Sequence, residues 1–405
     1  AKYRFAPTGT FNAFQPRRYT DRRIDHIFVS NDIKVSRYGT LTYHYFRDMK
    51  AEQQDMGSAA PKEIKGENRD VKCISDHYAI QSFLTLNNNA KPKKVNELNV
   101  GSFNIRNGRS LRPGEELPKK GDYSKYDGWD HRKKYVCDMV NLEAFDVFGA
   151  QEVRKGQLDD MLAMLPDYDY IGVGRDHGDD RGEFSPVFYR KDKFKMLNGG
   201  TFWLSETPDE VSRGWDGVCR RICSWGYFQR KSDKMRFYFL CIHLDHKGKE
   251  AQMEGSKLVV DWIKRNCKGE NAIVVGDFNV TQNSEAYSIF AESGILKDTY
   301  EAAKYRFAPT GTFNGFNPNR YTKQRIDHIF VTNNIDVSRY GVLTYRYFRK
   351  VDGEEQDMDT AAPKEVKGKD YEIKNPSDHY PIQSWITLNK GAKSKATNPQ
   401  HSKPM

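Results

Sequence analysis

Apolar and polar residues alternate along many short segments of this chain, which is the pattern of strands with one buried face. The longest of these segments starts shortly after a polar stretch that ends at residue 96. Runs of this length, separated by turn residues, indicate a fold rich in strands. The expected strands cover 98–105, 146–151, 168–173, 187–189, 201–204, 222–229, 236–244, 272–275, 325–331, 337–347 and 382–388.

Other segments carry apolar residues at the spacing of helices. We expect helices from about Trp129, around Leu158, over 250–265 and over 284–292, the last ending before Gly294, a residue favoured after a helix. Because these helices are interspersed irregularly among many strands, the pattern predicts an α+β fold with packed sheets.

A long repeat divides the chain. The sequence KYRFAPTGT at 2–10 returns at 304–312, and the two copies then stay in step through Leu86 and Leu388 without a gap. A segment that recurs once at this spacing is a duplicated piece of a domain, whereas solenoid repeats are a few tens of residues long. We therefore expect one complete domain at 97–390 and, at 1–89, a partial repeat of its C-terminal part.

The differences between the copies are mostly polar, as expected for solvated faces: Arg17 becomes Asn319 and Asp21 becomes Lys323. The apolar alternation is retained at Ile27 and Val29 and at the equivalent positions of the second copy. This alternation predicts a half-buried strand in both copies.

The remaining segments are polar. We expect a linker at 90–96, which contains Pro92, and a disordered tail at 391–405. Because no apolar run approaches the roughly 20 residues that span a bilayer, we expect no transmembrane segment. The compartment is unknown from the sequence, and a secreted or periplasmic protein is expected if a leader was removed. The six cysteines show no zinc-type spacing and are interpreted as buried thiols.

A formal net charge of +10 suits an anionic partner such as nucleic acid or phosphorylated headgroups. Lysines that only solubilise the surface would give the same net charge. Charged residues make up 30% of the chain, which is typical of an ordinary globular protein.

Polar side chains follow the ends of several predicted strands in the complete unit. Each motif alone has a structural explanation as a turn residue, a loop cap, a surface ion pair or a core histidine. Six of them in one unit predict a site held on a rigid scaffold. The motifs are Phe103-Asn104-Ile105, Gln151-Glu152, His243-Leu244-Asp245-His246, Gly276-Asp277-Phe278-Asn279, Arg325-Ile326-Asp327-His328 and Ser377-Asp378-His379.

The order of these motifs resembles the endonuclease/exonuclease/phosphatase superfamily of metal-dependent phosphoesterases. The resemblance covers about residues 97–390, and its most specific parts are the motifs at 276–279 and 377–379. It implies a four-layer α/β/β/α sandwich with two packed mixed β-sheets. The segment 172–186 further resembles a bacterial subgroup, although His177 stands where an acidic residue is more usual.

The resemblance also implies a metal site. Glu152, helped by Asn104 and Asp378, would hold Mg2+, with Mn2+ as the alternative. Carboxylate and amide oxygens suit such a hard cation. A metal bound to a phosphate oxygen neutralises the charge that grows during displacement.

The same resemblance implies a proton-transfer pair. His379 would take the proton from the attacking water, and Asp327 would accept the other imidazole N–H and fix the tautomer. Asp277 and Asn279 would orient the nucleophile or the phosphate, and His243 would donate a hydrogen bond or a proton on the other side.

Three further positions match the resemblance less specifically. Arg175 would clamp a phosphate oxygen as a substrate-binding residue, or would form a structural ion pair. Asp245 and His246 fit the pattern without an assigned role.

The expected function is a Mg2+-dependent phosphoesterase that hydrolyses phosphodiester bonds, with DNA or RNA as the first substrate to test. The alternative is a phosphatase or phosphodiesterase acting on a phosphoinositide, a sphingolipid or another small phosphorylated molecule. A non-catalytic module that binds anionic ligands is the third hypothesis. A pure binder has no need for both Glu152 and the Asp327/His379 pair.

The partial repeat brings Asp25, Asp76 and His77 but no counterpart of the metal-binding residues. We expect it to be inactive and to expose the apolar face of a sheet. It is an inert remnant, a partner for another chain through self-association, or a swap partner that replaces 303–391. Of these explanations, we favour the remnant.

Overall fold

The computed structural model of the protein describes residues 1–15, 19–20, 23–31, 33–48, 69–85, 97–108, 128–350 and 371–389. The expected linker at 90–96 and the expected tail at 391–405 lie outside these residues. Among the described helices, none combines the length and the apolar character needed to cross a membrane.

One sheet of the complete unit has six strands in the order β10-β11-β12-β13-β16-β14. Strands β12 and β13 run parallel and the other neighbours run antiparallel, so the sheet is mixed. The strands are β10 (Phe194–Trp203), β11 (Ile222–Arg230), β12 (Arg236–His243), β13 (Asn271–Asp277), β16 (Asp327–Thr332) and β14 (Leu296–Asp298).

The second sheet has seven strands in the order β15-β17-β20-β6-β7-β9-β8. It is also mixed, because β15 runs parallel to β17 and β6 runs parallel to β7. The strands are β15 (Tyr305–Phe307), β17 (Asp336–Val342), β20 (Ile382–Thr387), β6 (Glu97–Asn104), β7 (Val147–Gln151), β9 (Val187–Arg190) and β8 (Tyr168–Ile171).

The two sheets pack face to face, because alternate residues of each strand point into a shared core. Val147 of β7 and Val275 of β13 belong to this inter-sheet cluster, whereas the next residue of β7, Phe148, points to the opposite face. Sheets packed in this way interdigitate their inner side chains.

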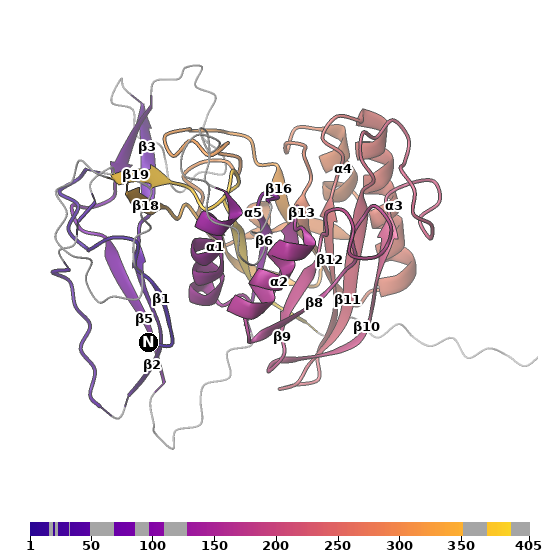
Figure 1. Cartoon of the computed structure of the whole chain (residues 1–405). Helices are drawn as coiled ribbons and strands as arrows, with labels where there is room; N and C mark the ends of the chain where they lie inside the picture. Colours follow the sequence, from indigo (N-terminus) through magenta and orange to yellow (C-terminus); the bar gives the residue numbers. More distant parts are fainter. Residues whose placement is uncertain are drawn as a thin grey trace, which may run out of the picture.

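Helices cover the outer faces of both sheets (Figure 1). Two of them pack against Phe148 and its neighbours, and two pack on the six-stranded sheet. The prediction of a four-layer α+β sandwich is therefore confirmed. The helices are α1 (Trp129–Glu143) and α2 (Lys155–Met164) on one side, α3 (Lys249–Cys267) and α4 (Glu285–Ala291) on the other, and the short α5 (Thr299–Ala302) before β15.

The predicted strand over 337–347 is wrong as a single element. Strand β17 ends at Val342, and β18 (Tyr347–Lys350) pairs instead with β19 (Tyr371–Lys374). Residues between them turn toward α1, where the Tyr345 hydroxyl donates a hydrogen bond to Glu143 and the Tyr347 ring stacks on Tyr135. The continuous apolar pattern thus reflects packing against a helix as well as a strand.

The partial repeat forms a three-stranded sheet, β1-β2-β5, with the same strand order as β15-β17-β20 (Figure 1). The predicted strand at Ile27 and Val29 is wrong in this copy, since no strand forms over 23–30. The equivalent β16 is paired on both edges, by β13 and β14, and the partial repeat contains no counterpart of either. Its strands are β1 (Tyr3–Phe5), β2 (Lys34–Leu41), β3 (His44–Asp48), β4 (Arg69–Cys73) and β5 (Ala79–Thr85).

Candidate active site

The polar residues at the strand ends surround one cavity of about 620 Å³ at an edge of the sandwich. Both sheets contribute, because Glu152 follows β7, His243 ends β12 and Asp277 ends β13. Among the predicted site residues, Asn104 and Asp327 stand behind the lining and contact it, and the others line the cavity directly. The lining residues are Arg106, Asn107, Glu152, Arg175, Glu183, Cys219, Arg221, His243, His246, Asp277, Asn279, Thr281, Phe313, Gln324, Ile326, Asp378 and His379.

A buried histidine–carboxylate pair stands at the floor of the cavity. His379 Nδ1 lies 2.8 Å from Asp327 Oδ2, and the two side chains are 5% and 1% exposed. His379 Nε2 faces Asp277 Oδ2 at 3.6 Å. Burial alone would lower the pKa of His379, but the charges of Asp327 and Asp277 outweigh it and raise the pKa to about 10. The imidazole is therefore protonated at neutral pH.

Asp277 is the most enclosed carboxylate of this group. It accepts hydrogen bonds from Asn104 Nδ2 at 2.9 Å and from the backbone N–H of Asn279 at 2.9 Å. His243 Nε2 lies 3.5 Å away. Burial raises the pKa of Asp277, and the negative charge of Asp327 adds to that shift. A carboxylate with a raised pKa is a better proton acceptor than an exposed one.

His243 stands on the side of the cavity that carries two arginines. Burial, assisted by the positive charges of Arg221 and Arg175, lowers its pKa well below the ordinary value. The imidazole is therefore neutral, and one of its nitrogens can donate a hydrogen bond.

Glu152 carries the second charged group of the site. It accepts from Asn104 Nδ2 at 3.1 Å, from the Asn107 backbone N–H at 3.0 Å, and from Arg106 Nη1 at 3.2 Å. Burial would raise its pKa, but the Arg106 charge and these hydrogen bonds lower it. Glu152 has a φ of +61°, a conformation that is strained for a non-glycine residue and is typical of functional sites.

A divalent cation suits the chemistry of this side of the cavity. The buried carboxylates of Glu152 and Asp378 share the guanidinium of Arg106, at 3.2 Å and 3.8 Å. One positive charge leaves this pair of acids incompletely neutralised. Accordingly, burial and the charge of Glu152 raise the pKa of Asp378. Two buried oxygen donors with surplus negative charge fit Mg2+ or Mn2+.

Asn104 connects the two halves of the site. Its amide nitrogen bonds both Glu152 and Asp277, and its oxygen accepts from the backbone N–H of Arg106. Asn104 therefore orients these two carboxylates in the structure. The Ser377 hydroxyl donates to the Asn104 carbonyl at 2.7 Å and ties the loop of His379 to β6.

Arg175 forms the ion pair that was one of its two expected roles. Its Nη1 lies 2.7 Å from Glu183 Oε2, and the Glu183 carboxylate also accepts from Asn107 Nδ2. Because Asn107 in turn donates to Glu152, a continuous chain of contacts joins Arg175 to the acidic side of the site.

Sequence reasoning missed Arg106, Asn107 and Arg221 as lining residues. Arg106 and Asn107 follow the Asn104 motif directly, so their proximity to it was the available signal. Arg221 precedes β11 without any motif. Glu183 stands in the segment that resembles the bacterial subgroup, but that likeness assigned it no role.

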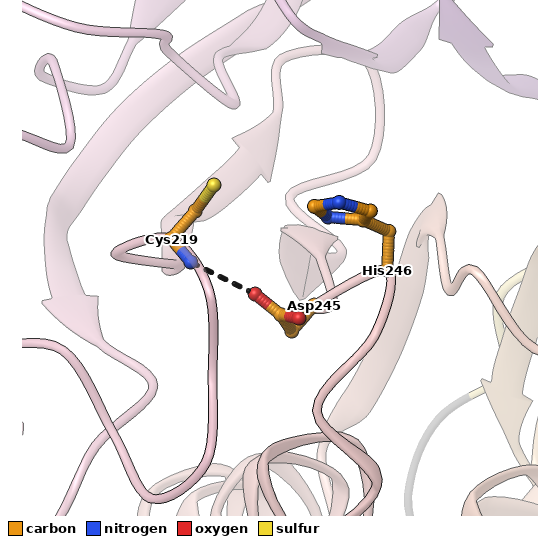
Figure 2. Close-up of side chains that lie close together, drawn as sticks. All are labelled: Cys219, Asp245 and His246. Atoms are coloured by element: carbon orange, nitrogen blue, oxygen red, sulfur yellow. Dashed lines mark hydrogen bonds between the residues drawn. The ribbon is translucent and has the colours of Figure 1, made fainter.

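Figure 2 shows Cys219, Asp245 and His246, a second group of potential metal ligands at the rim of the cavity. Each carboxylate oxygen of Asp245 accepts two backbone N–H groups, Oδ2 from Val218 and Cys219 and Oδ1 from Lys247 and Gly248. These bonds satisfy the carboxylate and hold two loops together. Asp245 is thus a structural residue that positions the rim.

The sequence model of the Endonuclease/Exonuclease/phosphatase family matches residues 101–379 of this chain. The chain therefore belongs to that family, as the resemblance of its motifs predicted. Members of the family are hydrolases that act on phosphoester bonds, and they generally depend on divalent metal ions.

Solved structures of Bacteroides proteins share both sequence and fold with the chain. A family protein from Bacteroides thetaiotaomicron is 44% identical with a TM-score of 0.64, and the match covers 73% of this chain and 98% of that one. A mannosyl-6-phosphatase of the same organism is 44% identical with a TM-score of 0.63, over 72% of this chain and 100% of that one. A Bacteroides vulgatus protein is 34% identical with a TM-score of 0.57, over 72% and 99% of the chains.

Among curated proteins, an uncharacterized protein of Acanthamoeba polyphaga mimivirus is 27% identical over 160 residues. This match covers 37% of the chain and 59% of the viral protein, so the chain spans less than two thirds of that relative.

Proposed function

We propose that the complete unit is a metal-dependent phosphatase that hydrolyses the phosphate ester of a small phosphorylated molecule, in particular a sugar phosphate. The observation that carries this proposal is the cavity itself. It brings the His379/Asp327/Asp277 group and the Glu152/Asp378 pair together in about 620 Å³. That volume falls in the range of small-molecule sites, roughly 300–1,000 Å³. The likeness to a mannosyl-6-phosphatase supports the substrate class.

Glu152 and Asp378 would hold the metal, and Asn104 would orient Glu152 toward it. When bound, Mg2+ or Mn2+ would withdraw charge from a phosphate oxygen. Arg106 already bridges these carboxylates. Its side chain is 37% exposed, so it can move aside without leaving a buried charge unpaired.

His379 would act on the phosphate as a proton-bearing donor. Asp327 accepts from Nδ1, which leaves Nε2–H directed into the cavity. The raised pKa keeps this proton in place at neutral pH. This role differs from the one expected from sequence, in which His379 received the proton of the water.

Asp277 would receive that proton instead. Its raised pKa makes it the stronger base of the group, and Asn279 lies beside it to hold the water. His243, which is neutral, would donate a hydrogen bond, and Arg175 would contact a phosphate oxygen from the opposite wall.

Nucleic acid, the first substrate suggested by the sequence, is the second candidate. The net charge of +10 favours it. The cavity gives it less support, since Phe313 is the single aromatic side chain among the described lining residues. Single-stranded nucleic acids usually stack on several aromatic side chains.

A substrate panel tests the proposal. Mannose 6-phosphate, other sugar phosphates, a phosphoinositide, DNA and RNA are each incubated with the full chain and Mg2+, Mn2+ or EDTA. We expect release of inorganic phosphate from a sugar phosphate, its loss in EDTA, and its loss in His379→Ala. Faster cleavage of DNA or RNA would contradict the substrate class, and turnover that persists in EDTA would contradict the metal site.

A further inference from the structure

The partial repeat and the complete unit meet through equivalent residues. Tyr43 and Tyr345 occupy the same position in the two copies, and their hydroxyls lie 3.3 Å apart with ring centroids 5.2 Å apart. The next equivalent pair, His44 and Arg346, also meets, with Nε2 and Nη2 2.6 Å apart. Contact between equivalent residues is the property of a two-fold axis.

Contacts away from this axis occur twice, once in each direction. Phe5 packs on Tyr345 at 4.7 Å, and Tyr43 packs on Phe307 at 5.1 Å. Phe5 is equivalent to Phe307, and Tyr43 to Tyr345, so these are the same contact made by each copy.

A second reciprocal pair lies further out. Tyr19 packs on Phe348 at 5.6 Å, and Phe46 packs on Tyr321 at 5.4 Å. Tyr19 is equivalent to Tyr321, and Phe46 to Phe348. The two copies are therefore related by a pseudo-two-fold axis, and the surface of each is complementary to itself.

One half of this symmetric arrangement is filled and the other is open. Strands β1 and β2 dock on α1, where Arg37 Nη1 donates to the Leu142 carbonyl at 2.6 Å and Gly39 packs directly against the Leu142 side chain. Around the equivalent Gly341, the nearest atoms belong to its own sheet, and Tyr305 is 62% exposed. The partial repeat brings no helix equivalent to α1, so nothing in it can cover β15 and β17.

We propose that the surface formed by Tyr305, Phe307, Tyr321 and residues 339–348 is the interface for a second complete phosphoesterase unit. In that pair each α1 would cover β15 and β17 of the other unit. Residues 1–85 occupy half of the interface in this chain. This inference is independent of the substrate and mechanism proposed above.

Position 346 selects which copy pairs best. Two identical units would bring two Arg346 guanidiniums together at the axis, whereas in this chain Arg346 faces His44. Burial and the charge of Arg346 lower the pKa of His44, which is therefore neutral and can accept the hydrogen bond. Pairing with a copy that carries histidine here avoids the like-charge contact.

The chain starting at residue 97 tests the interface. Solved relatives that align over 98–100% of their own length consist of this unit alone, so it folds without residues 1–96. We would mix the wild-type 97–405 chain with its Arg346→His variant and measure mass by sedimentation across a concentration series. We expect dimers in the mixture, bound roughly tenfold more tightly than either protein alone, whereas the full chain stays monomeric.

Matched substitutions define the surface. Tyr345→Asp in both components should abolish the dimer, whereas Leu197→Ala, on edge strand β10, should leave it intact. Circular dichroism and phosphatase activity report whether each variant is folded. A mixture that stays monomeric at every concentration, or a dimer indifferent to Tyr345→Asp, would overturn the proposal.

A second measurement uses the full chain with an added copy of residues 97–302 joined directly before residue 1. Residue 1 corresponds to 303, so the junction keeps the native order. We expect oxidative labelling of Tyr305 to fall several-fold relative to the unmodified chain, because the added α1 covers it. Tyr3, whose hydroxyl already donates to Asp167, is the internal control and should not change. Unchanged labelling of Tyr305 contradicts the interface.

Discussion

The two copies of the histidine motif share their local geometry and differ in their surroundings. His77 Nδ1 lies 2.8 Å from Asp25, the same distance that separates His379 from Asp327. The first pair is 36% exposed at both side chains, and the second is almost fully buried. The geometry of the pair therefore needs no more than the segment that the two copies share.

A threonine explains why the geometry is local. Thr10 Oγ1 accepts from the backbone N–H groups of Ile24 and Asp25, and Thr312 Oγ1 makes the same two bonds in the second copy. This loop fixes the aspartate wherever the segment folds. Burial and a neighbouring metal site, by contrast, come from residues 97–302, which only the second copy packs against. A catalytic pair can thus be formed without becoming a catalytic site.

Replacing each histidine gives the largest expected difference between the copies. His379→Ala should lower kcat/KM by about 10³- to 10⁴-fold, because the donor to the phosphate and the partner of Asp277 are both lost. His77→Ala should leave kcat/KM unchanged. Steady-state kinetics on the best substrate of the panel measure both, and a loss of activity in His77→Ala would show that the first copy takes part in catalysis.

The apolar residue after each aspartate–histidine–isoleucine run should separate the copies by stability. Phe330 is fully buried and Phe28 is 90% exposed. Phe330→Ala should cost about 3–5 kcal/mol of unfolding free energy, and Phe28→Ala should change it by no more than about 0.5 kcal/mol. Urea unfolding curves provide the comparison, and equal losses would mean that Phe28 is buried in solution.

The aspartates provide a smaller contrast. Asp327→Asn should lower kcat by about 10²-fold, because the imidazolium loses its charged partner while the hydrogen bond survives. Since Asp327 acts through His379, the alkaline limit of the pH–rate profile should also move to lower pH. Asp25→Asn should alter neither quantity. An unshifted profile in Asp327→Asn would remove this residue from the mechanism.

The smallest expected effect is on stability at alkaline pH. The pKa of His379 is raised from 6.5 to about 10, so the folded protein retains a proton that the unfolded chain releases above pH 6.5. Stability from this source is complete below pH 6.5 and is lost as pH rises through about 10. His379→Gln should flatten the fall in Tm over this window, and His77→Gln should retain it. Calorimetry at several pH values distinguishes them.

Alternation and strand-end motifs predicted the layers and most of the site, because both depend on residues close in sequence. Asp277 and Asp327 were found as the ends of apolar strands. Pattern failed at Ile27, where the same alternation that gives β16 gives no strand. A strand of this kind requires hydrogen-bonding neighbours, which come from distant sequence.

Electrostatic roles were equally beyond the sequence. The protonation of His379 depends on the joint positions of Asp277 and Asp327, which lie on neighbouring strands of one sheet. Arg106 was missed because its importance arises from standing between two acids that are far apart along the chain.

The ends of the complete unit lie side by side, because Thr387 at the end of β20 pairs with Glu97 at the start of β6. Thr85 is equivalent to Thr387, and only residues 86–96 separate it from Glu97. Residues 1–302 therefore hold the counterparts of every strand and helix of the unit, in circularly permuted order, with 86–96 as the connecting loop.

A ribosome completes that permuted set before it has made residue 303. The early copy is the weaker competitor, because Thr40 puts a hydroxyl where Val342 is buried among apolar side chains of the core. Order of synthesis thus favours one arrangement and packing favours the other. The nascent chain must exchange its first C-terminal third for its second before the sandwich described above is complete.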